Sequence, residues 1–466
     1  MNRSPRQLHS QFRTALLCST FLFSCAGAPV QAQDDFFTNL EIEPPDQGAD
    51  RDAPLSILGW VTEELSYGYR RPDPPFSRTD RQLTQVETSL YTQVDWQASD
   101  TLNFRFSGKA YHDAVFALES DTPFTNSERS LYRNRFEVRD FYLEKQFDSG
   151  LYLKAGHQIH AWGFAEFLRV TDLINTEDQY TIGQQDLEDI RLQVPSLQLS
   201  YSLLNWTLDA VVTFHAGYND IAPAGDEFDQ WLPIRQENWL IERDDPGNRS
   251  ETFLRASTHY ADGDLQIVVG EYNNNQLTID GISRIKSFSP TFHLAQQRMQ
   301  ALGVAANRVR GSWLLFGELG VQRNAPVTPL GLDALLNPRG WEERSRVLGA
   351  LGIEYNGFSN TLLSLELDNT HTRGDVQRLE IDRNQVGVGT RLYWTGWNER
   401  VELLSVWNRL ANDQGSLTRL SVDYNWSDNW KFGLLWVDYS AGRGSLYRGF
   451  RNNDMLQLNA RFSFQR

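Results

Sequence analysis

Segments in which apolar and polar residues alternate recur from about residue 54 to the C-terminus. Clear examples lie at 102–109, 361–368, 385–394 and 419–426, where most second residues are apolar. Because successive side chains of a β-strand point to opposite faces, this period of two predicts strands with one apolar and one polar face. The pattern does not change along this region, as it would between the two or three soluble domains expected at this length.

The alternation predicts about 18 strands, so the chain is expected to be all-β. The predicted ranges are 54–69, 83–97, 102–115, 135–147, 151–162, 190–203, 206–215, 251–261, 264–274, 289–306, 311–322, 346–356, 360–370, 384–394, 399–411, 416–426, 430–440 and 454–464.

Short and long connections alternate between these strands. The short ones are 98–101, 148–150, 204–205, 262–263, 307–310, 357–360, 396–398 and 427–429. The long ones include 116–134, 163–189, 216–250 and 323–345. Short turns on one rim, long loops on the other and an even strand count are typical of a transmembrane, antiparallel, up-and-down β-barrel of the bacterial outer membrane. A soluble propeller or sandwich has no reason to sort its loops in this way.

Aromatic residues support the same architecture. Six tryptophans lie beside the short turns, where an aromatic girdle would meet the membrane interface: Trp96, Trp206, Trp394, Trp397, Trp426 and Trp430. The last strand, 455–464, resembles the C-terminal strand by which barrel-assembly machinery recognises outer-membrane proteins, although Gln465 and Arg466 follow its final aromatic residue. No run of about 18 apolar residues follows residue 32, which excludes a helical inner-membrane protein.

The fifth predicted strand, 151–162, leads into a long connection. After Trp162 and Gly163 the alternation stops, and the chain continues through an acidic, helix-like stretch at 176–190. We expect the loop 163–189 to fold into the barrel and to set what passes through it.

The N-terminal region has the features of a secretory signal. Residues 1–32 combine three arginines, an apolar stretch and a small-residue cleavage site, which predicts Sec-type export in a Gram-negative cell. Residues 33–53 form an acidic, proline-containing lead-in, and the predicted barrel occupies 54–466. Both cysteines, Cys18 and Cys25, lie in the signal, so the mature chain has no thiol ligand or disulfide.

Charge narrows the choice of partner. The signal contains three of the 44 basic residues and none of the 60 acidic ones, so the mature net charge is 41 − 60 = −19. This argues against nucleic acid as a partner. Outer-membrane lipid and lipopolysaccharide are the expected surroundings.

One stretch carries a family resemblance. Residues 154–175, KAGHQIHAWGFAEFLRVTDLIN, and 189–203, DIRLQVPSLQLSYSL, resemble a family of proteobacterial outer-membrane β-barrels of unassigned function, related to the alginate-export porins. The matching region covers roughly 136–203, and its shared positions are Gly156, Gln158, Trp162, Gly163, Asp172, Asn175, Arg191 and Pro195. The resemblance implies an outer-membrane channel or export porin, which in some members works with an inner-membrane exporter of lipid-like or polysaccharide cargo.

The polar faces and the central loop supply the candidate pore-lining and substrate residues. They are Arg105, Lys109, Asp140, Glu144, Lys154, Gln158, Trp162, Arg169, Asp172, Arg391, Arg419, Asp423 and Arg461. Charged side chains around a wet pore select solutes by charge and size. The predicted function is therefore a channel or export porin for a small, lipid-like or polysaccharide solute, with a charged, arginine-containing lumen gated by loop 163–189. The same residues would also suit ion pairs that fill and stabilise a barrel.

Two other functions remain open, namely a plugged structural or adhesive barrel and an outer-membrane hydrolase. Catalysis has little support, because neither Gly-x-Ser-x-Gly nor His-Glu-x-x-His occurs. His157 and His160, three apart on a predicted strand, face opposite sides and cannot chelate one ion. We therefore expect no enzymatic activity, no metal and no cofactor.

Overall fold

The computed structural model describes residues 54–70, 83–118, 133–185, 189–222, 249–283, 290–329, 339–412, 414–442 and 450–466, together with residue 337 and parts of 224–243. The predicted signal peptide and acidic lead-in lie outside the described residues and stay predictions. None of the described helices has the length and apolar character needed to cross a membrane.

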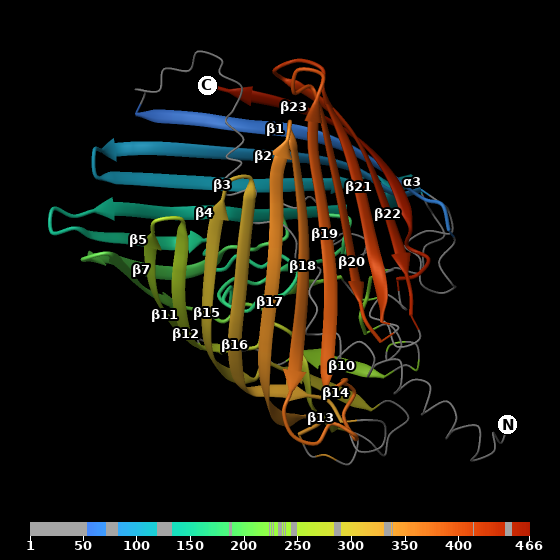
Figure 1. Cartoon of the computed structure of the whole chain (residues 1–466). Coiled ribbons are helices and arrows are strands. Elements are labelled where there is room, and N and C mark those ends of the chain that lie inside the picture. The colour runs from blue at the N-terminus through green and yellow to red at the C-terminus, as the bar shows by residue number, and fades with distance from the viewer. Residues whose placement is uncertain are drawn as a thin grey trace.

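Eighteen strands form one closed barrel (Figure 1). In chain order they are β1 (Leu55–Gly68), β2 (Leu83–Ser99), β3 (Leu102–Asp113), β4 (Asn134–Gln146), β5 (Leu151–Gln158), β7 (Val194–Leu203), β8 (Trp206–Thr213), β11 (Glu251–Tyr260), β12 (Gly263–Asn273), β15 (Arg298–Arg310), β16 (Trp313–Val327), β17 (Glu342–Phe358), β18 (Thr361–Thr372), β19 (Asn384–Gly396), β20 (Val401–Leu410), β21 (Gly415–Asn425), β22 (Trp430–Ser440) and β23 (Met455–Gln465). Each strand pairs antiparallel with the next, and β23 closes on β1 from Leu58↔Gln465 to Gly68↔Met455. The prediction of an all-β, antiparallel barrel of about 18 strands is confirmed.

Two boundary predictions around the fifth strand were wrong. β5 ends at Gln158 rather than at 162, because the backbone N–H of His160 donates to the side chain of Asn175 (2.8 Å) and not to a neighbouring strand. The following barrel strand begins at Val194 rather than at 190. The described part of the helix-like stretch holds no α-helix but turns and the short strand β6 (Asp178–Gln179), which pairs with β9 (Asp220–Ile221).

Two further predictions need correction. The strand expected at 289–306 is divided into β14 (Thr291–Ala295) and β15, and only β15 belongs to the barrel. β14 instead joins β10 (Leu240–Arg243) and β13 (Thr278–Ser283) in a small sheet at the end of the barrel away from the short turns (Figure 1). The turn expected at 307–310 lies at 311–312, because β15 continues to Arg310. The helix α3 (Val115–Leu118) follows β3.

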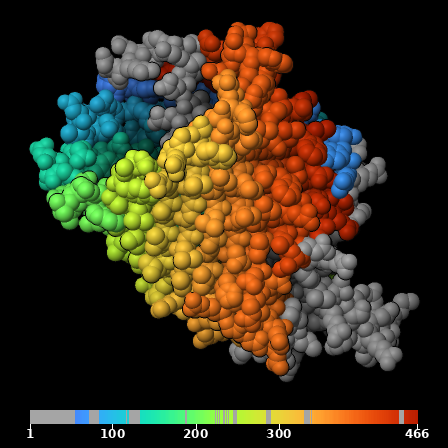
Figure 2. Space-filling model, viewed as in Figure 1, coloured from blue at the N-terminus to red at the C-terminus, as the bar shows by residue number. Residues whose placement is uncertain are grey.

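The two faces of the barrel wall differ as the alternation predicts. Outward side chains such as Phe136, Leu319 and Leu351 are large, apolar and exposed, at 68%, 61% and 69%. Figure 2 shows this outer surface as a continuous wall of side chains over the yellow and orange strands. On the inward face of the same strands lie buried polar residues such as Glu318 and Glu366. Apolar outside and polar inside is the reverse of a soluble protein and suits a barrel surrounded by lipid.

Candidate channel interior and the segment between β5 and β7

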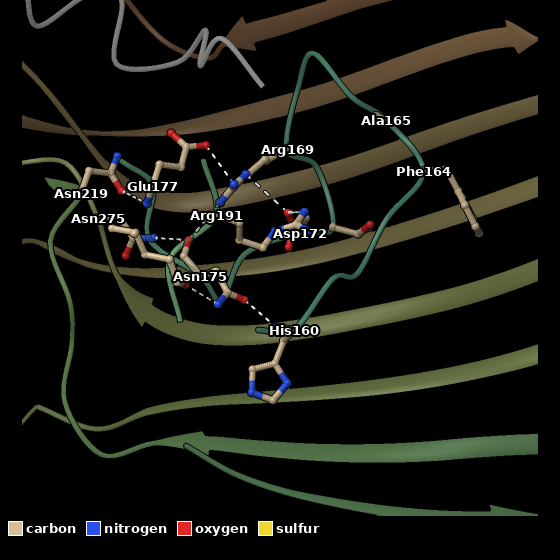
Figure 3. A network of polar contacts seen from close by, with 12 residues as sticks. His160, Phe164, Ala165, Arg169, Asp172, Asn175, Glu177, Arg191, Asn219 and Asn275 are labelled. Atoms are coloured by element: carbon tan, nitrogen blue, oxygen red, sulfur yellow. Dashed lines mark hydrogen bonds and ion pairs between the residues drawn. The ribbon is translucent and has the colours of Figure 1, made fainter. Parts of the chain in front are cut away.

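The chain between β5 and β7, described at 159–185 and 189–193, contains most of the loop that was expected to fold into the barrel, and we call it the central segment. It leaves β5 through Gly163, whose φ of 129° is a conformation that residues with a Cβ rarely adopt. Asn175 holds its two ends together, accepting from the backbone of His160 (2.8 Å) and donating to the carbonyl of Leu192 (2.6 Å) (Figure 3). Asn275, beyond β12, donates to the carbonyl of Asn175 (3.0 Å).

Two carboxylates of the barrel wall hold the first part of the central segment. Glu318 of β16 accepts from the backbone N–H groups of Phe164, Ala165 (2.9 Å) and Thr171 (3.1 Å) and from the Thr171 hydroxyl (2.9 Å). Glu366 of β18 accepts from the backbone of Glu166 (2.8 Å) and Phe167 (3.1 Å). These bonds satisfy buried N–H groups that have no partner in a regular ladder.

Ion pairs add to these hydrogen bonds. The Arg391 guanidinium of β19 lies between the carboxylates of Glu166 and Glu354, 3.0 Å from the latter. Within the central segment, Asp172 pairs with Arg191 (2.6 Å) and Arg169 (3.4 Å) (Figure 3). Arg169 also pairs with Glu177 (3.0 Å). All these side chains are largely buried.

The second part of the central segment contacts other strands. Asp189 pairs with both Lys109 of β3 and Arg139 of β4. Burial by itself raises the pKa of Asp189, but Arg139 and Lys109 outweigh it and hold that pKa well below its usual range. Arg419 of β21 donates to the carbonyls of Gly183 (3.3 Å) and Gln185. The central segment is therefore bonded to strands on opposite sides of the closed barrel.

Small residues on the inward face make room for these contacts. A Cβ at Gly320 would lie 2.8 Å from Val170, and one at Gly389 would lie 2.2 Å from the Phe167 ring. Apolar side chains of the segment form shared clusters with wall residues, such as Leu168 and Val170 with Leu348 and Ala350. Three more clusters join the segment to wall residues from β7 to β23. A further cluster places Tyr180 of the segment against Val115 of α3.

The predicted pore-lining residues fall into two groups. Those covered by the central segment or belonging to it are Lys109, Gln158, Trp162, Arg169, Asp172, Arg391 and Arg419. The Arg391 side chain is only 2% exposed. Those on the inward faces of β3, β4, β5, β21 and β23, away from the segment's apolar clusters, are Arg105, Asp140, Glu144, Lys154, Asp423 and Arg461. A role in lining the pore stays a prediction for every one of these residues.

The second group adjoins an aromatic wall. The Trp60 and Tyr91 rings stack with centroids 4.0 Å apart, and the Arg461 guanidinium lies 5.0 Å from the Trp60 centroid. The Lys154 ammonium lies 3.9 Å from the Tyr142 centroid. Arg105 pairs with Asp95 at 2.6 Å.

Sequence reasoning missed Glu318, Glu366, Asp189 and Arg139. Alternation places Glu318 on the polar face of WLLFGELGV and Glu366 on that of TLLSLELD, so an inward position could have been read for both. Their partners lie about 150 and 200 positions away along the chain, which no local pattern reveals. Among the described residues, no group of three or more His, Cys, Asp or Glu side chains could hold a metal ion.

A family match covers most of the chain. The family model described as "Protein of unknown function (DUF1302)" matches residues 76–464. The chain belongs to the DUF1302 family. A comparison with curated proteins finds no match. The link to the alginate-export porins is therefore still a prediction from the resemblance.

Solved structures with the same fold are similar to this DUF1302 protein. Acinetobacter baumannii OccAB1 has a TM-score of 0.52 at 9% identity, with 91% of this chain and 99% of that chain covered. A. baumannii OccAB4 has 0.52 at 6%, with 89% and 99% covered, and OccAB3 has 0.51 at 8%, with 88% and 99% covered. At such low identity the likeness shows the fold alone, and that fold is the 18-stranded barrel of outer-membrane porins.

Proposed function

We propose that this DUF1302 protein is an outer-membrane channel in which the central segment sets the width of the lumen. The observation that carries the proposal is that one segment is bonded to both sides of a closed barrel. Its Asp189 pairs with β3 and β4, and its Ala165 donates to Glu318 of β16. A segment held in this way divides the cross-section of the barrel. The porin-like fold and the apolar outer wall support an outer-membrane location after Sec-type export.

The solute path lies along one wall. Most apolar contacts of the central segment fall on the part of the wall from β7 to β23, so that side is filled by packed side chains. On the other side Tyr180 packs against Val115 of α3. The inward faces of β23 and β1 to β5 instead carry charged and aromatic groups, among them Trp60, Arg105, Lys154 and Arg461. A small, lipid-like or polysaccharide solute would pass along this second wall, with lipopolysaccharide outside and an inner-membrane exporter as partner.

Single-channel recording tests the proposal. The refolded mature chain should give stable openings in a planar bilayer. Deletion of 165–184 should raise the conductance, because it removes the part of the segment held by Glu366, Arg391 and, at Gly183, Arg419. Trp397→Ala, in a short turn with a 76% exposed side chain, is the control and should leave the conductance unchanged. Folding is checked in each variant by heat-dependent mobility on a gel.

One alternative has support in the same contacts. A segment this extensively bonded would also plug a structural or adhesive barrel, which would stay silent in the bilayer. A silent wild-type protein whose deletion variant conducts would favour the plugged barrel. Silence of both, with folded protein, would reject a channel altogether.

A further inference from the structure

Arg346 is an inward arginine of the barrel wall that lies outside the contacts described so far. It lies on β17, opposite Gln322 of β16 and Thr372 of β18. Its hydrogen bond runs from Nη2 to the carbonyl of Pro326 at 3.3 Å. Its Nε–H is buried and has no partner, and no carboxylate of the described residues pairs with it. A guanidinium without an anion in such a place is costly, because desolvation is not offset.

The neighbours of Arg346 supply further donors. The Thr372 side chain is 0% exposed, and its hydroxyl has no hydrogen-bond partner. As the cross-strand neighbour of Arg346 on the same face, it lies roughly 5 Å away between Cβ atoms. Tyr272 of β12 is buried and close enough for the charge of Arg346 to act on its phenol.

The backbone opposite this pair is irregular. On β16 the register shifts between Gln322 and Ala325, so that two residues stand opposite Ser345 alone. Asn324 in this bulge has a φ of 58°. The bulge directs the Pro326 carbonyl toward the guanidinium. Bulges of this kind often re-aim groups at functional sites.

Arg346 and Thr372 lie on the long-loop side of the central segment. Leu348 and Ala350, which follow on the same face of β17, contact the central segment, and the short turn lies beyond them at 359–360. Arg346 is thus on the side of the central segment that faces the long loops. It therefore lies at the long-loop end of the barrel, on the wall opposite the proposed solute path.

We propose that Arg346, Thr372 and Tyr272 form a binding site for an oxyanion, a carboxylate or a phosphate group, on the inner wall of the barrel. Such an anion accepts from the Nε–H of Arg346 and from the two hydroxyls, and it neutralises the guanidinium. The role of this site in transport rests on the proposed channel, whereas the binding itself does not.

Calorimetric titration of the detergent-solubilised mature protein tests the site without any need for conductance. Benzoate and phenyl phosphate are the probes, and benzamide is the neutral reference. Wild type should bind at least one of the two anions and not benzamide. The preferred anion tells which oxyanion the site takes. Absence of binding of both anions by folded wild-type protein would overturn the proposal.

Variants locate the binding. Arg346→Gln should weaken the preferred anion by about tenfold or more, and Thr372→Val by a few-fold, as expected for bonds to a charged group. Arg373→Gln removes the same charge from an exposed residue next to Thr372 and should leave binding unchanged. If Arg346→Gln does not fold, Thr372→Val and Tyr272→Phe carry the test. Equal binding by these variants and wild type, or an equal loss in Arg373→Gln, would reject the site.

Failure of the channel and failure of the site are distinguishable. Binding with a silent bilayer would keep the site and reject transport. Openings without anion binding would keep the channel and reject the site.

Discussion

Single side chains of the barrel wall determine how the central segment is held. Glu318 alone accepts four hydrogen bonds from Phe164, Ala165 and Thr171. A buried carboxylate is tolerated only when its oxygens find such donors. The wall therefore uses charge to fix a backbone that has no ladder of its own.

His160 makes part of this attachment sensitive to pH. Burial, together with the nearby charges of Lys154 and Arg255, lowers the pKa of His160 to about 4. An unfolded histidine titrates near 6.5, so between about pH 6.5 and 4 the unfolded chain binds a proton that the folded chain does not. The stability that neutral His160 contributes is fully present above pH 6.5 and is lost as the pH falls through this window.

We expect the free energy of unfolding to fall by about 2–3 kcal/mol more in wild type than in His160→Gln between pH 7.5 and 4.5. Urea denaturation followed by heat-dependent gel mobility measures the difference. His371→Gln, on the outward face of β18, should behave as wild type. An equal pH effect in His160→Gln would show that His160 is not the group responsible.

The variant Arg391→Ala tests whether this arginine holds the central segment in place or selects ions in the lumen. Arg391→Ala leaves Glu166 and Glu354 without their shared cation, and an unpaired buried charge costs about 3–5 kcal/mol. We expect a larger and noisier single-channel current with unchanged ion preference. Arg105→Ala, whose side chain is 38% exposed, should instead change the anion-to-cation preference. A lost anion preference at constant conductance in Arg391→Ala would make Arg391 a pore-lining cation after all.

At this scale the sequence predicts which face a side chain occupies, but not what it contacts. Arg391 and Glu366 both fall on the polar face by simple alternation. Whether the side chain of such a residue contacts water or the central segment depends on residues that lie more than a hundred positions away along the chain. Asp172 was expected to line the pore as a residue of the central loop, whereas it pairs with Arg191, and Asn175 likewise has its partners within the segment itself.

Strands were predictable from the sequence where residues only a few positions apart determine them. Every barrel strand was expected, because period-two patterning and turn residues act over a few positions. Prediction failed at β5 and β14, where a tertiary contact ends or diverts a strand. After Gln158 the alternation continues in sequence to Trp162, but Asn175 takes the backbone bond that a neighbouring strand would have provided.

In the central segment, too, tertiary contacts override a local prediction, here of a helix. Its acidic composition at 176–190 favours a helix locally, yet its described part forms turns and the β6–β9 pair. Here the backbone N–H of Tyr180 donates to the Asp178 carboxylate, and Arg419 donates to the carbonyl of Gly183, so each turn is fixed by its own bond. Contacts with the wall outweigh helix propensity, which is a weak preference.

For the whole molecule, the proposed off-centre path predicts that thiols introduced on one wall react with a reagent in the lumen and that thiols on the opposite wall do not. The predicted mature chain has no cysteine, so introduced thiols would be the only ones. Gln93→Cys, on the inward face of β2, should react with a charged methanethiosulfonate reagent and lower the current. Thr370→Cys, 2% exposed on β18, and Leu351→Cys, outward and 69% exposed, should not respond. A response at Thr370→Cys with none at Gln93→Cys would place the path on the other wall.

The attachment of one segment to β3, β4, β16, β18, β19 and β21 also has a mechanical consequence. A hollow tube of paired strands flattens readily under lateral pressure, because its walls can hinge without losing pairs. A crosspiece bonded to both sides resists that flattening, as a strut stiffens a ring. The cross-section of this barrel is therefore set from within, and it stays nearly constant when the tension or thickness of the surrounding bilayer changes.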